Sequence, residues 1–288
     1  MKIHHLNCGT FCPYGGHLFD GVTKGLGQGR LVCHCLLIET KDQLVLVDTG
    51  LGTRDVRAPV PRLSKFFLNL LRPHFRFQDT AIEQIRRLGF SARDVRHIVL
   101  THLDFDHAGG IEDFPHAEVH LLRAEEDAAE RRSGFIARRR YRPTQFEGME
   151  NWNTYLADGE RWFGFKSVRD MQGLPPEILM IPLIGHTWGH AGIAVQSDGR
   201  WLLHAGDAYF YREEMNINTP RCTPGLRAYQ FMMEVNRKAR LQNQRRLREL
   251  IQHHSDEVTV VSAHDPMEFL SLRQMSESIA PTELRRAA

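Results

Sequence analysis

The most informative part of this 288-residue chain reads Thr101-His-Leu-Asp-Phe-Asp-His-Ala-Gly-Gly110. It follows the apolar run Val95–Leu100, which predicts a buried strand. Four side chains that could bind a metal lie within the six residues 102–107, directly after that strand: His102, Asp104, Asp106 and His107. The small residues 108–110 leave room for a tight loop that turns these groups inward. Imidazole and carboxylate ligands together suit zinc, iron, manganese or cobalt. Six residues cannot complete two coordination spheres, so other segments must contribute.

Later segments repeat this arrangement of an apolar, strand-like run followed by a possible ligand. The candidates that end such runs are His186 with His190, Asp207, and His264. An earlier run, Leu44–Val47, ends in Asp48 in the same way. Because functional side chains tend to lie where strands end, these distant segments are expected to form one site. His204 precedes Asp207 on its strand and is expected to point away from that site.

The order of the expected elements predicts an α/β fold, with two sheets packed face to face and helices outside. We interpret residues 1–288 as one domain. The expected strands are 31–39, 43–47, 95–100, 117–121, 178–183, 192–196, 201–205 and 257–262. The expected helices are 63–71, 80–88, 123–132, 228–253 and 266–279. The aromatic and basic stretch 133–172 is expected to be an insertion over a substrate cleft, and its part 152–165 is either a substrate wall or core.

Composition excludes several classes of protein. The formal net charge of +2 is too small to indicate a nucleic-acid or membrane partner. Five cysteines, without a segment resembling a signal peptide, argue against a disulfide framework and favour the cytoplasm. Cys33 and Cys35 are interpreted as buried strand residues.

A basic cluster is formed by Arg131, Arg132, Arg138, Arg139, Arg140 and Arg142. It could steer an anionic substrate, or it could be a solvated helix face or an oligomer contact. This cluster and the segment 228–253 are candidate contacts of a possible homodimer.

Taken in order, these segments resemble the metallo-β-lactamase superfamily, with its H-x-H-x-D-H, G-H-T-x-G-H, G-D and late-histidine motifs. Leu44–Gly50 looks like the early V-D-T-G strand end of that family. The resemblance spans residues 31–266 and implies a four-layer αββα sandwich. Within the superfamily, Asp106–Gly110 and the strand leading to Arg123-Ala-Glu125 look most like the branch of the N-acyl-homoserine lactonases.

The resemblance implies two divalent metal ions. Zinc is the leading candidate, and manganese and iron are the alternatives. It implies that His102, Asp104 and His186 bind one ion, and that Asp106, His107 and His264 bind the other. Asp207 would bridge the two ions, and a bridging hydroxide would attack the substrate, with Asp106 orienting or deprotonating the water. Asp48 would fix a histidine tautomer through a hydrogen bond to the ring nitrogen that does not bind metal. His190 would not be a ligand.

Two positions depart from the family pattern. Asp104 stands where the motif has a histidine, which adds a negative charge and is expected to reduce the Lewis acidity of the first ion. Alternatively, Asp104 does not bind metal and one site is weak. Phe210 stands where the lactonases have a tyrosine, and Tyr209 or Tyr211 could replace that tyrosine only if the loop differs. These three residues are the candidates for substrate binding.

The leading hypothesis is therefore a metallo-hydrolase of a small ester or lactone, the best guess being a substrate like an N-acyl-homoserine lactone. Thioester hydrolysis or iron-dependent sulfur or oxygen chemistry is the enzymatic alternative. A degenerate binding domain is the non-enzymatic alternative, and the nearly complete set of ligands argues against it.

Overall fold

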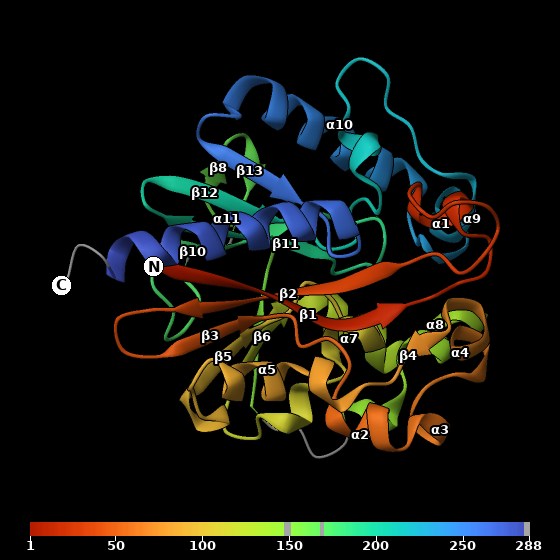
Figure 1. Ribbon diagram of the computed structural model, residues 1–288, viewed down its shortest axis with the longest axis horizontal. Helices are drawn as coiled ribbons and strands as arrows, with labels where there is room; N and C mark the ends of the chain where they lie inside the picture. Colours follow the sequence, from red (N-terminus) through yellow and green to blue (C-terminus); the bar gives the residue numbers. More distant parts are fainter. Residues whose placement is uncertain (147–150, 168–169, 285–288) are drawn as a thin grey trace.

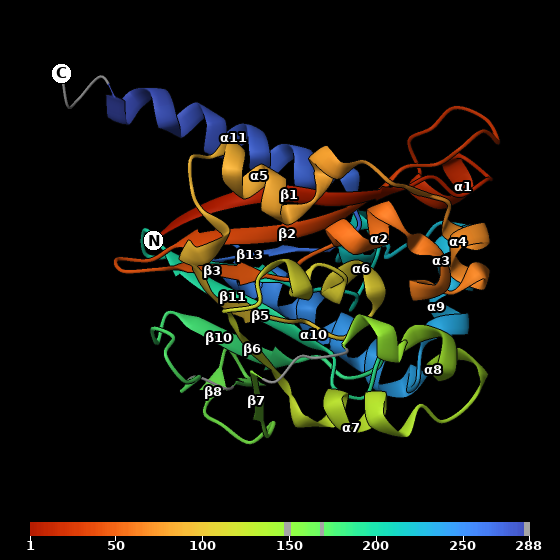
Figure 2. The same cartoon turned by 90° about the horizontal axis from the view of Figure 1, so that it is seen from below.

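Two β-sheets face each other in the structure, a computed structural model that describes residues 1–146, 151–167 and 170–284, and of residues 277–284 only the backbone. In the described residues, seven strands form one sheet in the order β4-β1-β2-β3-β5-β6-β7, and four form the other in the order β10-β11-β12-β13. Helices lie outside both sheets (Figures 1 and 2). The strands of the first sheet are β1 (Lys2–Phe11), β2 (Leu31–Glu39), β3 (Leu44–Val47), β4 (Pro73–His74), β5 (Val95–Val99), β6 (Glu118–Leu122) and β7 (Trp152–Tyr155). Those of the second are β10 (Ile178–Pro182), β11 (Ala191–Ser197), β12 (Arg200–His204) and β13 (Val258–Val261).

The core between the sheets follows from the alternation of side chains along each strand. Leu36 and Ile38 of β2 face the second sheet, where they join Ile193 and Val195 of β11. Leu37, between them in sequence, points to the opposite face and joins the outer helices. All these side chains are fully buried, and each contributes about 1.5–3 kcal/mol by leaving water.

Helices complete the outer layers on each side. The outer face of the first sheet packs against α5 (Ala81–Arg87) and α7 (Arg123–Arg131). The outer face of the second sheet packs against α10 (Arg237–His254) through Leu247 and Leu250. The predicted αββα arrangement of layers is therefore present. The remaining helices are α1 (His17–Asp20), α2 (Thr53–Arg57), α3 (Pro59–Arg62), α4 (Lys65–Leu71), α6 (Phe105–Ala108), α8 (Phe135–Arg140), α9 (Pro224–Met233) and α11 (Pro266–Leu284).

The single helix expected over 228–253 is wrong, because the chain breaks between α9 and α10. Glu234 has an extended backbone at this point, and the side chain of Asn236 caps α10 by accepting from the Ala239 N–H. The N–H groups of Val235 and Asn236 both donate to the carbonyl of Gly185. A tertiary contact with the 186–190 segment thus replaces the helical hydrogen bonds at the break.

The stretch 133–172 is more regular than expected in its described part. It contributes α8, it adds β7 to the edge of the first sheet, and it forms a hairpin of β8 (Arg161–Trp162) and β9 (Phe165–Lys166). Trp162 and Phe165 pack in the core beneath α10, so they are not a substrate wall. Residues 147–150 and 168–169 of this predicted insertion lie outside the described residues.

The cysteine thiols and the length of the helices bear on two simple properties of the chain. All five cysteines are free thiols, and Cys33 and Cys35 are buried on β2 as expected. Every helix in the described ranges is too short or too polar to serve as a transmembrane span.

Candidate metal centre

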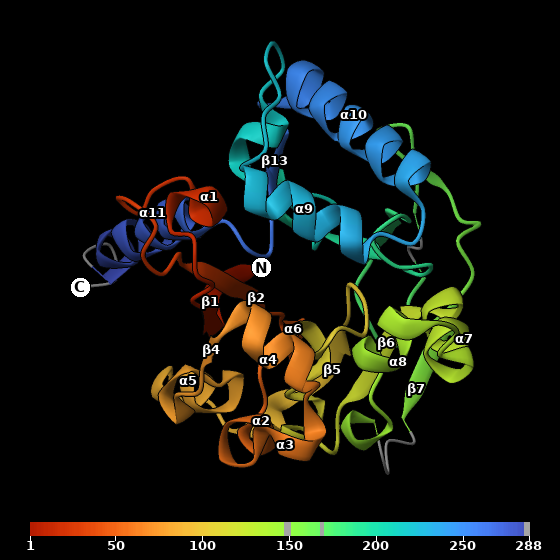
Figure 3. The same ribbon diagram turned by 90° about the vertical axis from the view of Figure 1, so that its right-hand side faces the viewer.

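The segments that follow β5, β10, β12 and β13 bring their histidine and aspartate side chains together. α8 and α9 close over this group, since Arg140 of α8 contacts both Asp104 and the carbonyl of Met233 on α9. Figure 3 looks onto this end of the molecule, with α4, α8 and α9 toward the viewer.

A first group of four ligand atoms comprises His102 Nε2, Asp104 Oδ2, His186 Nε2 and Asp207 Oδ2. Asp104 Oδ2 lies 3.0 Å from His186 Nε2 and 3.4 Å from His102 Nε2. Asp207 Oδ2 lies 3.3 Å from His186 Nε2 and 3.8 Å from His102 Nε2. Ligands about 2.0–2.1 Å from a tetrahedral zinc ion are about 3.3 Å apart, so the spacing fits one ion.

A second group lies beside the first. His107 Nε2 and His264 Nε2 are 3.3 Å apart. Asp207 Oδ1 lies 3.2 Å from the former and 3.1 Å from the latter. Asp106 Oδ2 lies 3.8 Å from His107 Nε2 and 3.5 Å from His264 Nε2. This group therefore also has the spacing of one coordination sphere.

The two groups share Asp207, which turns Oδ2 to the first and Oδ1 to the second. His102 Nε2 is buried and has no hydrogen-bond partner among the described residues, and Asp207 Oδ1 is buried between His107 Nε2 and His264 Nε2. Burial opposes the charge of Asp207, but His264, His107 and His186 hold its pKa well below the usual range. Buried polar atoms without partners are costly, and bound cations would satisfy them. The donor set therefore fits two metal ions that share one carboxylate.

For His107 and His264, hydrogen bonds to the outer ring nitrogen fix which nitrogen faces the centre. Asp48 Oδ2 lies 2.7 Å from His107 Nδ1, and the carbonyl of Val32 lies 2.7 Å from His264 Nδ1. Both contacts leave Nε2 as the free nitrogen, an arrangement common behind metal-binding histidines. His190 has neither nitrogen free, because Nδ1 lies 3.0 Å from the carbonyl of Leu183 and Nε2 accepts from the Asp207 N–H.

Arg140 is a residue of the site that the sequence did not reveal. It is the buried member of an otherwise exposed or partly exposed basic cluster, and its Nε lies 2.8 Å from Asp104 Oδ1. Its other nitrogens donate to the carbonyls of His186 and Met233. Burial would raise the pKa of Asp104, but Arg140 and His102 hold it well below the usual range.

This ion pair changes the expected effect of Asp104. The two oxygens of that carboxylate have different partners, Arg140 for Oδ1 and the first ligand group for Oδ2. The guanidinium offsets the negative charge that Asp104 adds when it replaces a neutral histidine. The reduced Lewis acidity expected from Asp104 considered that carboxylate alone, and it stays a prediction.

Glu125 ties the surrounding loops together. Its buried carboxylate accepts hydrogen bonds from the N–H groups of Leu103 and Gly189 and from the hydroxyl of Tyr141. It thus links the 102–107 motif, the 186–190 motif and the end of α8. The sequence contained only a weak indication of this role, because Glu125 comes shortly after the strand that ends at Leu122.

The three candidates for substrate binding lie in different places. Tyr209 is fully buried, and its hydroxyl donates to Glu268, away from the metal centre. Tyr211 packs against Gly21 and Arg212. Phe210 alone faces the centre, with its ring stacked on His264 at 5.1 Å.

Tyr229 of α9 is a second residue that the sequence analysis missed. Its ring meets Phe210 edge-on at 5.6 Å. Burial raises its pKa well above the usual range, and the carboxylates of Asp106, Asp104 and Asp207 add to that effect. A partly buried phenol therefore lies within electrostatic reach of all three carboxylates.

Two neighbouring groups are less suited to metal. Cys33 lies within reach of Asp106 and His264, but burial raises its thiol pKa well above the ordinary value. The other group consists of His97, His120 and Glu118. The ring nitrogens of the two histidines are hydrogen-bonded to each other, with 2.9 Å between His97 Nδ1 and His120 Nε2, and His120 Nδ1 is hydrogen-bonded to the Tyr155 hydroxyl. These nitrogens are therefore already engaged.

Comparisons with known proteins agree with this geometry. The family model "Metallo-beta-lactamase superfamily" matches residues 28–252. A probable metallo-hydrolase of Mycobacterium tuberculosis is 41% identical over 266 residues, which cover 92% of this chain and 81% of that protein. The chain belongs to the metallo-β-lactamase superfamily.

More distant relatives and solved structures include several lactonases of this superfamily. An N-acyl homoserine lactonase of Bacillus thuringiensis is 30% identical over 217 residues, covering 73% of this chain and 79% of that protein. A solved N-acyl homoserine lactone hydrolase, with a product bound at its catalytic metal center, superposes with a TM-score of 0.70 at 20% identity. That match covers 94% of this chain and 95% of the other, and it shows the metallo-β-lactamase fold. A dizinc quorum-quenching lactonase matches with a TM-score of 0.57 at 16% identity, over 92% and 87% of the two chains.

Proposed function

We propose that this protein is a metallo-hydrolase that hydrolyses a small ester or lactone with the help of two divalent ions. Zinc is the metal that we propose, and manganese and iron are the alternatives. The observation that carries the proposal is the pair of ligand groups that share Asp207. One has four ligand atoms, and the other has three with Asp106 beside His107 and His264. When bound there, such ions supply Lewis acidity and lower the pKa of water at neutral pH. The named lactonase relative supports a lactone as substrate.

Asp106 is the proposed proton acceptor. In the metal-free chain, burial raises its pKa above the ordinary value, while His107 and His264 act in the opposite direction. A carboxylate held beside the attacking water can accept its proton as a general base. Its place at the edge of the second group puts it beside the proposed reaction centre.

Phe210 and Tyr229 are proposed to receive the substrate. The Phe210 ring covers His264 and offers an apolar surface for an acyl chain. The Tyr229 hydroxyl has no hydrogen-bond partner among the described residues, and the carboxylates of Asp106, Asp104 and Asp207 help to raise its pKa, so the phenol remains a protonated donor. It is therefore proposed to donate to a substrate oxygen, in place of a tyrosine at position 210.

The test is a panel of N-acyl-homoserine lactones, simple esters and thioesters, assayed on metal-free protein reconstituted with zinc, manganese or iron. We expect hydrolysis that chelation abolishes and that His107→Ala abolishes. The matched control is His253→Ala, which removes an exposed histidine at the end of α10. Oxygen uptake by the iron form without hydrolysis would support the alternative of oxygen chemistry at iron. Stoichiometric metal without turnover of any substrate would support a binding domain.

Compartment and assembly belong to the proposal as well. We propose a reducing compartment, the cytoplasm, because all five cysteines are free thiols. A small molecule is the proposed partner, and a homodimer stays a prediction that sedimentation of the purified protein would check.

A further inference from the structure

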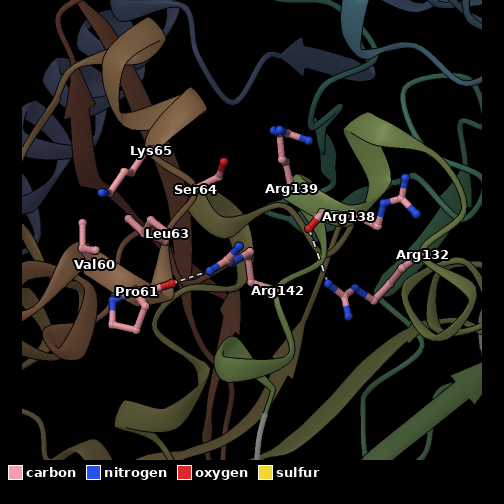
Figure 4. Close-up of a pocket in the computed structure, with 9 residues that line it drawn as sticks. All are labelled: Val60, Pro61, Leu63, Ser64, Lys65, Arg132, Arg138, Arg139 and Arg142. Atoms are coloured by element: carbon pink, nitrogen blue, oxygen red, sulfur yellow. Dashed lines mark hydrogen bonds between the residues drawn. The ribbon is translucent and has the colours of Figure 1, made fainter.

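A basic cavity of about 510 Å³ opens between α3, α4 and α8 (Figure 4). Its lining residues are Val60, Pro61, Leu63, Ser64, Lys65, Arg132, Arg138, Arg139 and Arg142. Five of the nine are cationic and none is acidic. Four of the six arginines of the basic cluster thus line this one cavity.

The cations of this cavity have no ion-pair partner among the described residues. Nearby arginines differ, since Arg62 pairs with Asp55 and Arg131 lies 3.9 Å from Asp127. Within the part of the chain that the structure describes, the buried Nε of Arg132 also lacks a hydrogen-bond partner. The contacts that Figure 4 marks run to backbone carbonyls, from Arg142 to Pro61 and from Arg132 to Arg138. Like charges that gather in one cavity repel one another, and a bound anion would offset that cost.

The chemistry of the lining defines a class of ligand. Guanidinium groups bind phosphate through paired hydrogen bonds, and several together fit more than one phosphate. One wall of the cavity is apolar and could contact a non-polar part of the ligand; it is formed by Val60, Pro61 and Leu63. The volume is that of a small-molecule pocket, and the net charge of +2 for the chain argues against a broad surface for nucleic acid. We propose that this cavity binds a small organic molecule bearing two or more phosphate groups.

The cavity is separate from the metal centre but shares a helix with it. Ring contacts run from Phe135 of α8 through Phe66 and Phe67 to Phe105, which lies in the 102–107 motif. Within α8, Arg138 and Arg139 face the cavity, while the next residue, Arg140, reaches Asp104. A ligand in the cavity would thus contact the helix that positions Arg140. The proposal of a binding site does not depend on the proposed hydrolysis.

The test is calorimetric titration of the metal-loaded protein with pyrophosphate and tripolyphosphate at fixed ionic strength, with citrate as the carboxylate probe. We expect saturable binding, tighter for tripolyphosphate than for citrate. Arg138→Ala should weaken it by about tenfold or more, because each charge-assisted contact contributes strongly. Arg138 is exposed and its side chain makes no ion pair among the described residues, so the variant should fold. Arg131→Ala, on the neighbouring helix but outside the cavity, is the matched control and should bind as the unchanged protein does.

Three results would overturn the proposal. One is equal affinity in Arg138→Ala and the unchanged protein, which would place the anion elsewhere, including at the metal ions. Another is citrate binding as tightly as tripolyphosphate. The third is a single-stranded oligonucleotide that displaces tripolyphosphate and binds more tightly, which would indicate a nucleic-acid surface.

Discussion

Removing the charge of Arg140 should destabilise the metal-free protein strongly, and removing its partner as well should not add to the loss. Arg140 and Asp104 are both buried, with 2.8 Å between Nε and Oδ1. Breaking such a pair from one side leaves an uncompensated charge and costs about 3–5 kcal/mol. Arg140→Met also removes the donors to the carbonyls of His186 and Met233. It leaves the buried carboxylates of Asp104 and Glu125 without this cation, so it should cost more than Asp104→Asn.

The double variant tests whether the two residues act as a unit. With both charges gone, the loss should approach that of Arg140→Met alone, giving a coupling energy of about 3 kcal/mol. The measurement is urea unfolding in the presence of a chelator, with metal content determined separately for each variant. Losses that add within about 0.5 kcal/mol would refute the reasoning, because independent sites behave in that way.

Three further predictions follow from the same centre and its surroundings. Tyr229→Phe should lower kcat/KM for the best ester or lactone by about tenfold at unchanged metal content, because the substrate loses one hydrogen bond. The control Tyr14→Phe changes an exposed tyrosine and should leave kcat/KM unchanged. Asp48→Asn should weaken metal binding by about 10–100-fold, measured by competition with a chromogenic chelator, because His107 loses the carboxylate that fixes its tautomer. Burial and Asp265 raise the pKa of Glu268 to about 8, so its protonated form stabilises the fold at low pH and that contribution is lost as pH rises toward 8. Glu268→Gln should therefore gain stability relative to the unchanged protein between about pH 5 and pH 8, as seen in thermal unfolding across that range.

Each of these has an outcome that contradicts it. Equal losses in Tyr229→Phe and Tyr14→Phe would mean that the phenol does not touch substrate. Unchanged metal affinity in Asp48→Asn would mean that His107 keeps its orientation without the carboxylate. Parallel pH profiles for Glu268→Gln and the unchanged protein would mean that Glu268 is ionised in the folded state throughout.

The sequence predicted the layers and the ligand candidates because both depend on local patterns. Alternating or continuous apolar runs identify strands, and polar residues at strand ends identify the edge where they meet. His102, Asp207 and His264 could therefore be grouped although they lie far apart in the chain. β1 escaped prediction because its first residues, Lys2–His5, are polar or only partly buried.

Arg140 and Tyr229 could not be predicted in the same way. Five other arginines lie within nine residues of Arg140, and none of the six differs from the rest in local pattern. Only the packing of α8 against α9 decides which of them is buried. Tyr229 lies in a segment that reads as one long helix, and its position over Phe210 depends on the break near Asn236. Both residues depend on tertiary contacts that local periodicity does not encode.

The carboxylate of Glu125 has a consequence for how metal would enter. It fixes Leu103, Gly189 and Tyr141 relative to one another through direct hydrogen bonds that involve no metal. The loops bearing His102 and His186 therefore lose their conformational freedom during folding rather than during ion binding. In small zinc domains the ion orders the chain, and most of its binding free energy is consumed in folding. Here the scaffold is pre-organised, so ion binding retains its intrinsic affinity, and metals should exchange into a chain that is already folded.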